Sequence, residues 1–192
     1  MKAPIPENET DRLKALHELE ILDTEADESF DDLTRLAGYI CETPIALITF
    51  VDSERQWFKS PSDFPVTETP RDISFCAHAI LQSEPFIVPD ALDDERFKDN
   101  PFVTSEPNIR FYAGAPLTTE KGFELGTLCV MDTEPRTLTA GQIAALKVLR
   151  NQVINLIKSR RERIFMNRDR DEDRKKIQEL EEKLYKVKQL VN

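Results

Sequence analysis

Residues 44–60 read PIALITFVDSERQWFKS, and this stretch decides the fold class. Its first half is rich in β-branched and other apolar residues, which predicts a buried strand that ends near Asp52. The second half, RQWFKS, predicts another strand, and the short polar link favours an antiparallel hairpin. Adjacent side chains of a strand face opposite sides, so we expect one of Trp57 and Phe58 in the core and the other near a pocket or interface.

Helical patterns precede this hairpin, and a mixture of helix and strand patterns follows it. Residues 9–20 predict a short amphipathic helix, and Asp27 and Ser29 are candidate caps of a second helix. Downstream, the proline-rich stretch 61–73 predicts a loop, and Ser74 is a candidate cap of a short helix, SFCAHAILQS. An edge strand is predicted for PFIVPD, and a loop with one helical turn for ALDDERFKDNPFV. Two more strands are predicted for IRFYAGAPLTT and FELGTLCVMD. This order predicts an antiparallel α+β sheet.

The C-terminal part changes to an uninterrupted helical pattern. Thr139 and Gln142 fit a capping box, and neither Gly nor Pro occurs after Gln142. A helix of this length would extend about 75 Å. A heptad-like apolar seam predicts a parallel coiled coil that dimerises the chain; it consists of Ile177, Leu180, Leu184, Val187 and Val191.

Composition and charge exclude several classes of protein. Residues 1–140 carry 12 basic and 28 acidic side chains, a net charge of −16, which disfavours nucleic acid as a partner. The longest apolar run is far shorter than the roughly 20 residues that span a bilayer, and the N-terminus lacks a secretory signal. Three cysteines without a CxxC pair favour a reducing, cytoplasmic location and argue against a structural metal site.

Several segments together carry a family resemblance. In order, they resemble bacterial GAF domains of the kind found at the N-terminus of sensor kinases and diguanylate cyclases. The resemblance implies a six-stranded antiparallel sheet with helices on one face and a ligand pocket on the other. It divides the chain into a sensory domain, 1–158, and a helical coiled-coil signalling segment, 159–192. The segments are RLKALHELEILDT, PIALITFVDSERQWFKS, ETPRDISFCAHAI, DDERFKDNPFV, RFYAGAPL and LGTLCVMDTEPRTL.

The resemblance also points to features that this chain lacks. Relatives that bind cyclic nucleotides carry Asn-Lys…Phe-x-x-x-Asp-Glu after the last strand, and here Leu138 stands at the Phe position and Gln142 and Ile143 at the acidic pair. This departure disfavours a cyclic nucleotide. Some relatives attach a bilin or reduce methionine sulfoxide through a cysteine in the region of Cys76. The reductase needs a second cysteine in the 90–110 loop, which this chain does not have there.

The helix around 74–82 and the loop 90–109 are expected to cover the pocket. Cys76 has two interpretations, a reactive thiol or a small buried side chain. The candidate ligand-binding residues combine aromatic surface with a few polar groups, as small-molecule pockets do. They are Trp57, Arg71, Phe75, Cys76, His78, Asp90, Phe97, Asn100 and Tyr112.

The sequence therefore predicts a cytoplasmic signal-input module rather than an enzyme. A small ligand or partner would bind the first domain, and a homodimeric coiled coil would pass the signal to an effector such as a kinase or cyclase outside these residues. The alternatives are a thiol-dependent reductase of the free methionine sulfoxide type and a bilin-binding photoreceptor, both using Cys76. The sequence does not name the ligand; bilins and cyclic nucleotides are disfavoured, and no metal, nucleic-acid or membrane partner is expected.

Overall fold

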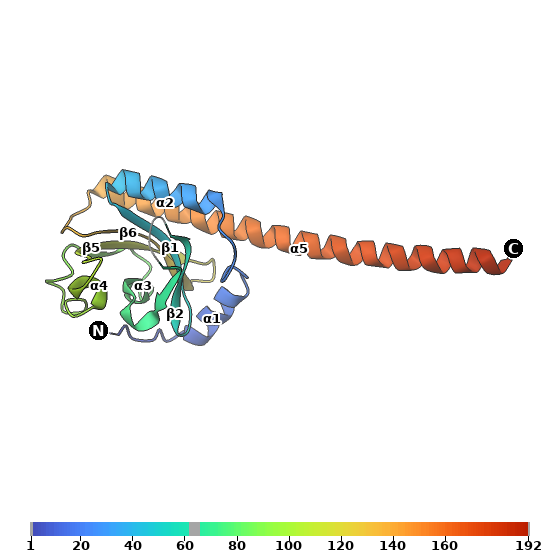
Figure 1. The fold of residues 1–192 in the computed structure, drawn as a ribbon, viewed down its shortest axis with the longest axis horizontal. Coiled ribbons are helices and arrows are strands. Elements are labelled where there is room, and N and C mark those ends of the chain that lie inside the picture. Colours follow the sequence, from blue (N-terminus) through green and yellow to red (C-terminus); the bar gives the residue numbers. More distant parts are fainter. Residues whose placement is uncertain (1, 62–65, 192) are drawn as a thin grey trace. The chain divides into compact units, whose positions relative to one another are not determined.

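The computed structural model describes residues 2–61 and 66–191. The chain divides into two compact units, Met1–Ile157 and Lys158–Asn192. The first unit contains a six-stranded sheet and the helices that pack on it (Figure 1). The second unit consists of the continuation of α5 (Ala140–Val191), the helix that begins in the first unit.

The sheet is antiparallel, with the strand order β3-β2-β1-β6-β5-β4. Its strands are β1 (Ile45–Val51), β2 (Arg55–Pro61), β3 (Glu68–Pro70), β4 (Phe86–Val88), β5 (Phe111–Thr118) and β6 (Glu124–Asp132). The predicted hairpin of β1 and β2 is confirmed, with Phe50 opposite Trp57. β6 pairs with β1 on one side and with β5 on the other, so it runs through the middle of the sheet.

The prediction of a plain loop over residues 61–73 is wrong for its second half. Glu68–Pro70 forms β3, which pairs with β2 at the edge of the sheet. An edge strand tolerates proline because only one side of it needs backbone donors, so the prolines that predicted a loop do not exclude a short strand. The 3₁₀ helix η1 (Arg71–Ile73) follows at once.

The predicted caps explain where the helices begin. Asp27 caps α2 (Glu28–Cys41) by accepting a hydrogen bond from the Ser29 backbone N–H. The Ser74 hydroxyl caps α3 (Phe75–Ala79), a helix shorter than the predicted stretch. Thr139 and Gln142 form the predicted capping box at the start of α5. The remaining helices are α1 (Glu9–His17) and α4 (Pro101–Thr104).

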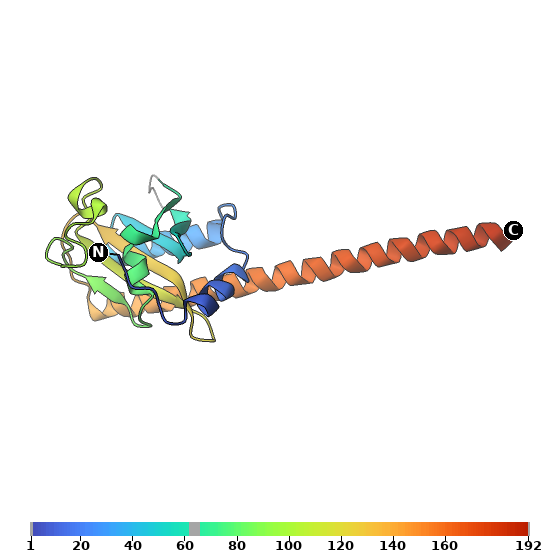
Figure 2. The same ribbon diagram turned by 90° about the horizontal axis from the view of Figure 1, so that it is seen from below.

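Two apolar clusters lie on the two faces of the sheet. The first contains residues of α2 and of the first turns of α5, such as Phe30 and Leu146, packed on one face. The second contains residues of α3, α4 and the neighbouring loops, such as Phe75 and Val103, on the other face. Figures 1 and 2 show this layering, with α3 in front of the strands in Figure 2. The sheet is therefore a single layer between two cores.

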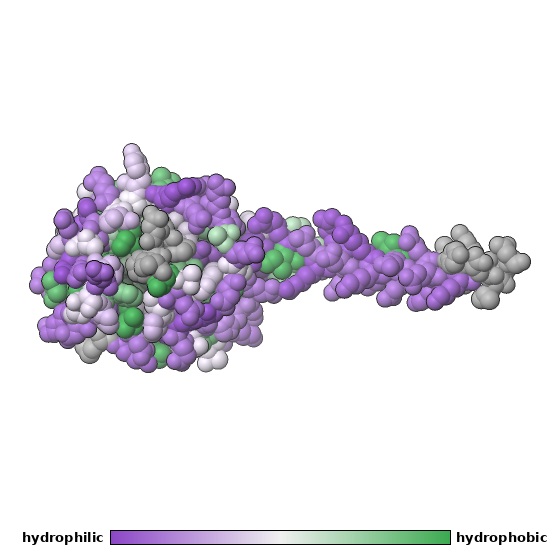
Figure 3. Space-filling view, in the orientation of Figure 1, coloured by the Kyte–Doolittle hydropathy of each residue, from purple (hydrophilic) through white to green (hydrophobic). Residues whose placement is uncertain are grey.

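The second unit presents a largely hydrophilic surface in Figure 3, interrupted by isolated hydrophobic positions. Ile177 and Leu180 are more than half exposed on α5. The side chains of Leu184, Val187 and Val191, the other members of the predicted seam, lie outside the described residues. The seam thus remains a prediction.

Candidate functional site

A small cavity of about 20 Å³ lies between the second face of the sheet and the segment that runs from η1 to α4. This volume has room for about one water molecule. A larger ligand can therefore enter only if the covering segment moves. The cavity is lined by Leu47, Gln56, Phe58, Thr69, Ile73, Ser74, Phe75, Cys76, Phe102, Ile109, Tyr112 and Met131.

Polar side chains tie the covering segment together. Asn100 caps α4 by accepting from the Phe102 N–H, and its amide nitrogen donates to the Ile73 carbonyl of η1 at 2.8 Å. Ser74, which caps α3, also donates to the Gln56 side chain on β2. These contacts hold η1, α3 and α4 in one cover over the cavity.

One polar group of the cavity wall has no hydrogen-bond partner among the described residues. The Thr69 hydroxyl is buried, with 6% of the residue exposed, and Thr69 is one of the residues that line the cavity. A buried hydroxyl without a partner costs free energy unless a water or a ligand satisfies it. Thr69 is thus a residue of the cavity wall that carries a buried polar atom without a partner among the described residues.

Aromatic rings form one wall of the cavity. Phe75 stacks between Phe97 and Tyr112, with ring centroids 4.1 and 5.2 Å away. His78 lies behind this wall, edge-on to Phe97 at 4.8 Å. Stacked rings of this kind offer a flat, apolar surface with little conformational freedom.

A sulfur cluster, formed by Cys76, Cys129, Tyr112 and Thr127, lies beside that wall. The hydroxyls of Tyr112 and Thr127 lie 3.2 and 3.1 Å from the Cys76 sulfur, and the Cys129 sulfur lies 3.9 Å from it. Burial by itself raises the pKa of the Cys76 thiol, but the hydrogen bonds that its sulfur accepts lower it below the usual range. The pKa of Cys129 is raised by its contact with Cys76 and by burial. The two hydroxyl hydrogen bonds to the Cys76 sulfur therefore favour the thiolate form of this residue.

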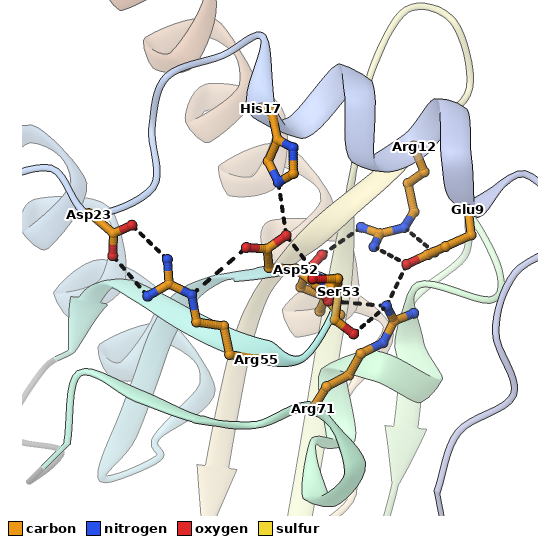
Figure 4. Close-up of polar contacts among 9 residues, drawn as sticks. Glu9, Arg12, His17, Asp23, Asp52, Ser53, Arg55 and Arg71 are labelled. Carbon is orange, nitrogen blue, oxygen red and sulfur yellow. Dashed lines mark hydrogen bonds and ion pairs between the residues drawn. The ribbon is translucent and has the colours of Figure 1, made fainter.

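An N-terminal clamp, formed by Glu9, Arg12 and Arg71, fixes the other end of the cover (Figure 4). Arg12 is 1% exposed, binds the Glu9 carboxylate through two nitrogens and donates to the Val51 carbonyl at 2.7 Å. Arg71 of η1 pairs with the same carboxylate and also contacts the Asp52 carbonyl. Burial raises the pKa of Glu9, but the two guanidinium groups outweigh it and lower that pKa to about 2.

Three of the sequence-predicted candidates line the cavity, namely Phe75, Cys76 and Tyr112. His78 and Phe97 are not among the lining residues, and Phe97 contacts the cavity wall through its stacking on Phe75. The other candidates have positions of their own in the fold. Asn100 caps α4, Arg71 belongs to the clamp, Asp90 accepts a hydrogen bond from the Leu92 N–H, and Trp57 packs in the first core cluster.

Trp57 and Phe58 separate across the sheet as the strand pattern predicts. Trp57 stacks on Phe50 on the side of α2 and α5, whereas Phe58 lines the cavity. Phe58 is therefore the member of this pair that a ligand would meet.

Sequence reasoning missed Cys129, Thr127 and Thr69. The family resemblance points to the 90–110 loop for a second cysteine, yet the partner of Cys76 lies on β6, 53 residues away. The signal available in the sequence was alternation in FELGTLCVMD, which places Thr127 and Cys129 on one face of the strand. Only the strand order brings that face beneath α3.

The described residues offer neither a cluster of metal ligands nor a membrane-spanning helix. Within residues 2–61 and 66–191, no group of three or more His, Cys, Asp or Glu side chains could hold a metal ion. Across the same part of the chain, every helix is too short or too polar to cross a bilayer.

Comparison with known proteins identifies a family and a curated relative. The family model for the GAF domain matches residues 25–157. A cyclic di-GMP phosphodiesterase of Pseudomonas aeruginosa is 50% identical over 133 residues, which cover 69% of this chain and 23% of the relative. The chain thus spans less than a quarter of that protein's length.

Solved structures share the fold. The GAF domain of an Acinetobacter phosphoenolpyruvate-protein phosphotransferase superposes with a TM-score of 0.58 at 17% identity, covering 80% of this chain and 94% of its own. A free methionine-R-sulfoxide reductase of Neisseria meningitidis, solved with its substrate, gives 0.57 at 15% identity and coverages of 80% and 90%. At such identities the likeness concerns the fold alone.

Proposed function

The chain belongs to the GAF domain family, and we propose that it works as a signal-input module whose cavity binds a small molecule. In this proposal the domain regulates and does not catalyse. Helix α5 carries the signal to an effector outside these residues. Because the relative from P. aeruginosa is a cyclic di-GMP phosphodiesterase, an enzyme of cyclic di-GMP turnover is the effector class that we propose. Three buried free thiols support a reducing compartment, the cytoplasm.

The observation that carries this proposal is that one strand lines the cavity and also belongs to the apolar cluster that contains α5. Met131 of β6 lines the cavity, while Leu128 and Val130 of the same strand belong to the cluster that contains Leu146 and Val153 of α5. Packed layers respond to a change of volume by shifting as units rather than by compressing. A ligand that displaces β6 therefore biases the position of α5.

The lining residues support a small ligand with one flat apolar face and at least one hydrogen-bonding group. The rings of Phe75 and Tyr112 would contact the flat face. The unpartnered hydroxyl of Thr69 would bond the polar group. We propose Phe58, Phe75, Cys76, Thr69 and Tyr112 as the ligand-contacting set.

Native mass spectrometry of freshly purified protein tests the ligand. We expect a non-covalently bound small molecule on the wild-type chain, and less of it on Thr69→Val, which keeps the shape but removes the hydroxyl. Thr133→Val is the matched control, because Thr133 is exposed after β6. Absence of any bound molecule, or equal occupancy in both variants, would contradict the proposal.

We further propose that the chain forms a homodimer through the seam on α5. Ile177 and Leu180 expose 56% and 63% of their surface in a single copy, and a second copy of the same helix would bury them. Sedimentation equilibrium on Ile177→Asp should show a shift toward monomer. Gln178→Asp, one position along the same helix, introduces the same residue off the seam and should leave the dimer intact. A monomeric wild type would refute this part of the proposal.

A further inference from the structure

Two thiols that are distant in the sequence meet in the second core. Cys76 lies on α3 and Cys129 on β6, and their sulfur atoms are 3.9 Å apart. A disulfide requires the sulfurs to approach to about 2.05 Å. The third thiol, Cys41, belongs to the cluster on the opposite face of the sheet.

The hydrogen bonds from nearby hydroxyl groups distinguish the Cys76 sulfur from the Cys129 sulfur. Two hydroxyls, those of Tyr112 and Thr127, point at the Cys76 sulfur, and hydrogen bonds to a thiolate favour its formation. Gly114, the register partner of Cys129, provides the space for the Tyr112 hydroxyl. A Cβ atom at residue 114 would overlap with that hydroxyl. The absence of a side chain at Gly114 thus leaves room for the Tyr112 hydroxyl, which donates to the Cys76 sulfur.

Cys76 is among the residues that line the cavity, whereas Cys129 is not among them. The cavity volume of about 20 Å³ suits a molecule near the size of water. Hydrogen peroxide, the smallest hydroperoxide, is of that order of size. A bulky organic hydroperoxide is not.

We propose that Cys76 and Cys129 form a thiol pair that responds to hydrogen peroxide. The Cys76 thiolate attacks one peroxide oxygen, the O–O bond breaks, and hydroxide leaves and is protonated to water, which leaves a sulfenic acid on Cys76. The sulfur of Cys129 then attacks the Cys76 sulfur, its thiol proton and the departing OH group form water, and a disulfide results. Two electrons pass from the two sulfurs to the peroxide.

The disulfide would join the cover of the cavity to the strand beneath it. α3 contributes Phe75 and Cys76 to the cavity wall, and β6 carries on its other face the residues that pack against α5. Oxidation would therefore restrain α3 and β6 relative to each other. Oxidation of the thiol pair needs no other ligand. Its test is therefore independent of the test of the small-molecule binding proposed above.

Intact-mass analysis of the full chain after titration with hydrogen peroxide tests the proposal. We expect the loss of two hydrogen masses per chain, and peptide mapping of the oxidised wild type should locate a Cys76–Cys129 disulfide without recourse to any variant. Cys129→Ser should instead accumulate a sulfenic acid on Cys76 that dimedone traps.

Two further variants separate the pair from general thiol oxidation. Cys41→Ser should behave as the wild type, because Cys41 lies on the other side of the sheet. Tyr112→Phe should slow oxidation about tenfold, because a hydrogen bond to a charged sulfur is lost. A disulfide that includes Cys41, oxidation that stops at an unpaired cysteine in the wild type, or no reaction with hydrogen peroxide would each overturn the proposal.

Discussion

Replacing Arg12 by methionine should destabilise the first unit more than any exposed charge change. Arg12 is 1% exposed, and its guanidinium group bonds both oxygens of the Glu9 carboxylate, at 2.7 and 2.8 Å, and the Val51 carbonyl. Methionine replaces most of the aliphatic volume but none of the three hydrogen bonds. Removal of one partner from a buried ion pair costs about 3–5 kcal/mol, because the other charge stays behind.

Arg71 moderates this cost, because it still pairs with Glu9 in the variant. We therefore expect a decrease of about 3 kcal/mol in the free energy of unfolding, at the lower end of that range. For a domain of this size, such a loss lowers the melting temperature by roughly 6–12 °C. Urea denaturation followed by circular dichroism measures the first quantity, and a thermal scan the second.

The chain offers a matched control. Asp32 and Arg35 form an ion pair with the same spacing along a helix as Glu9 and Arg12, but both side chains are more than 60% exposed. Arg35→Met should leave the midpoint of the urea transition unchanged, since exposed pairs are screened by solvent. If Arg12→Met and Arg35→Met shift that midpoint equally, burial of the clamp does not contribute to stability and our reasoning fails.

Three further changes test other contacts. Because the pKa of Glu9 is lowered from 4.5 to about 2, its contribution to the free energy of unfolding is complete above pH 4.5 and disappears as pH falls toward 2, so Glu9→Gln should flatten this part of an acid titration. Gly114→Ala should cost about 1–3 kcal/mol in urea and alter the near-UV signal of Tyr112, since the added methyl overlaps with its hydroxyl. Gly141→Ala, with space around it, should not destabilise. Thr139→Ala should cost about 1 kcal/mol through loss of the capping hydrogen bond at α5.

Local patterns predicted most of the fold. Alternation and β-branching located β1 and β2, and the caps Asp27, Ser74 and Thr139 placed three helix starts, because each depends on residues within a few positions of one another. The count of six strands came from the family resemblance instead, and the strand order was not predicted. β3 was missed, since its pairing with β2 outweighs what its own prolines indicate.

The site was harder to predict, because its geometry depends on contacts between distant segments. Phe75, Cys76 and Tyr112 were found from their residue types near the expected cover. Arg71 was expected to face a ligand, but it pairs with Glu9, 62 residues away in the chain. Cys129 was missed because its contact with Cys76 also joins segments that are distant in the chain. Its proximity to Cys76 follows from the register of β6, which a single sequence does not reveal.

The physical boundary of the sensory domain differs from the range matched by the family model. That range begins at residue 25, yet Arg12, Leu16 and Ile21 are fully buried in the first unit. The Glu9 carboxylate of α1 also forms an ion pair with Arg71 of η1. Ile73, at the other end of η1, lines the cavity. Any movement of α1 therefore acts on the cover of the cavity through a buried ion pair. Since α1 packs on the sheet and α5 packs on the same apolar cluster through Leu146 and Val153, both ends of this unit contact the layer that a ligand or an oxidised thiol pair would displace.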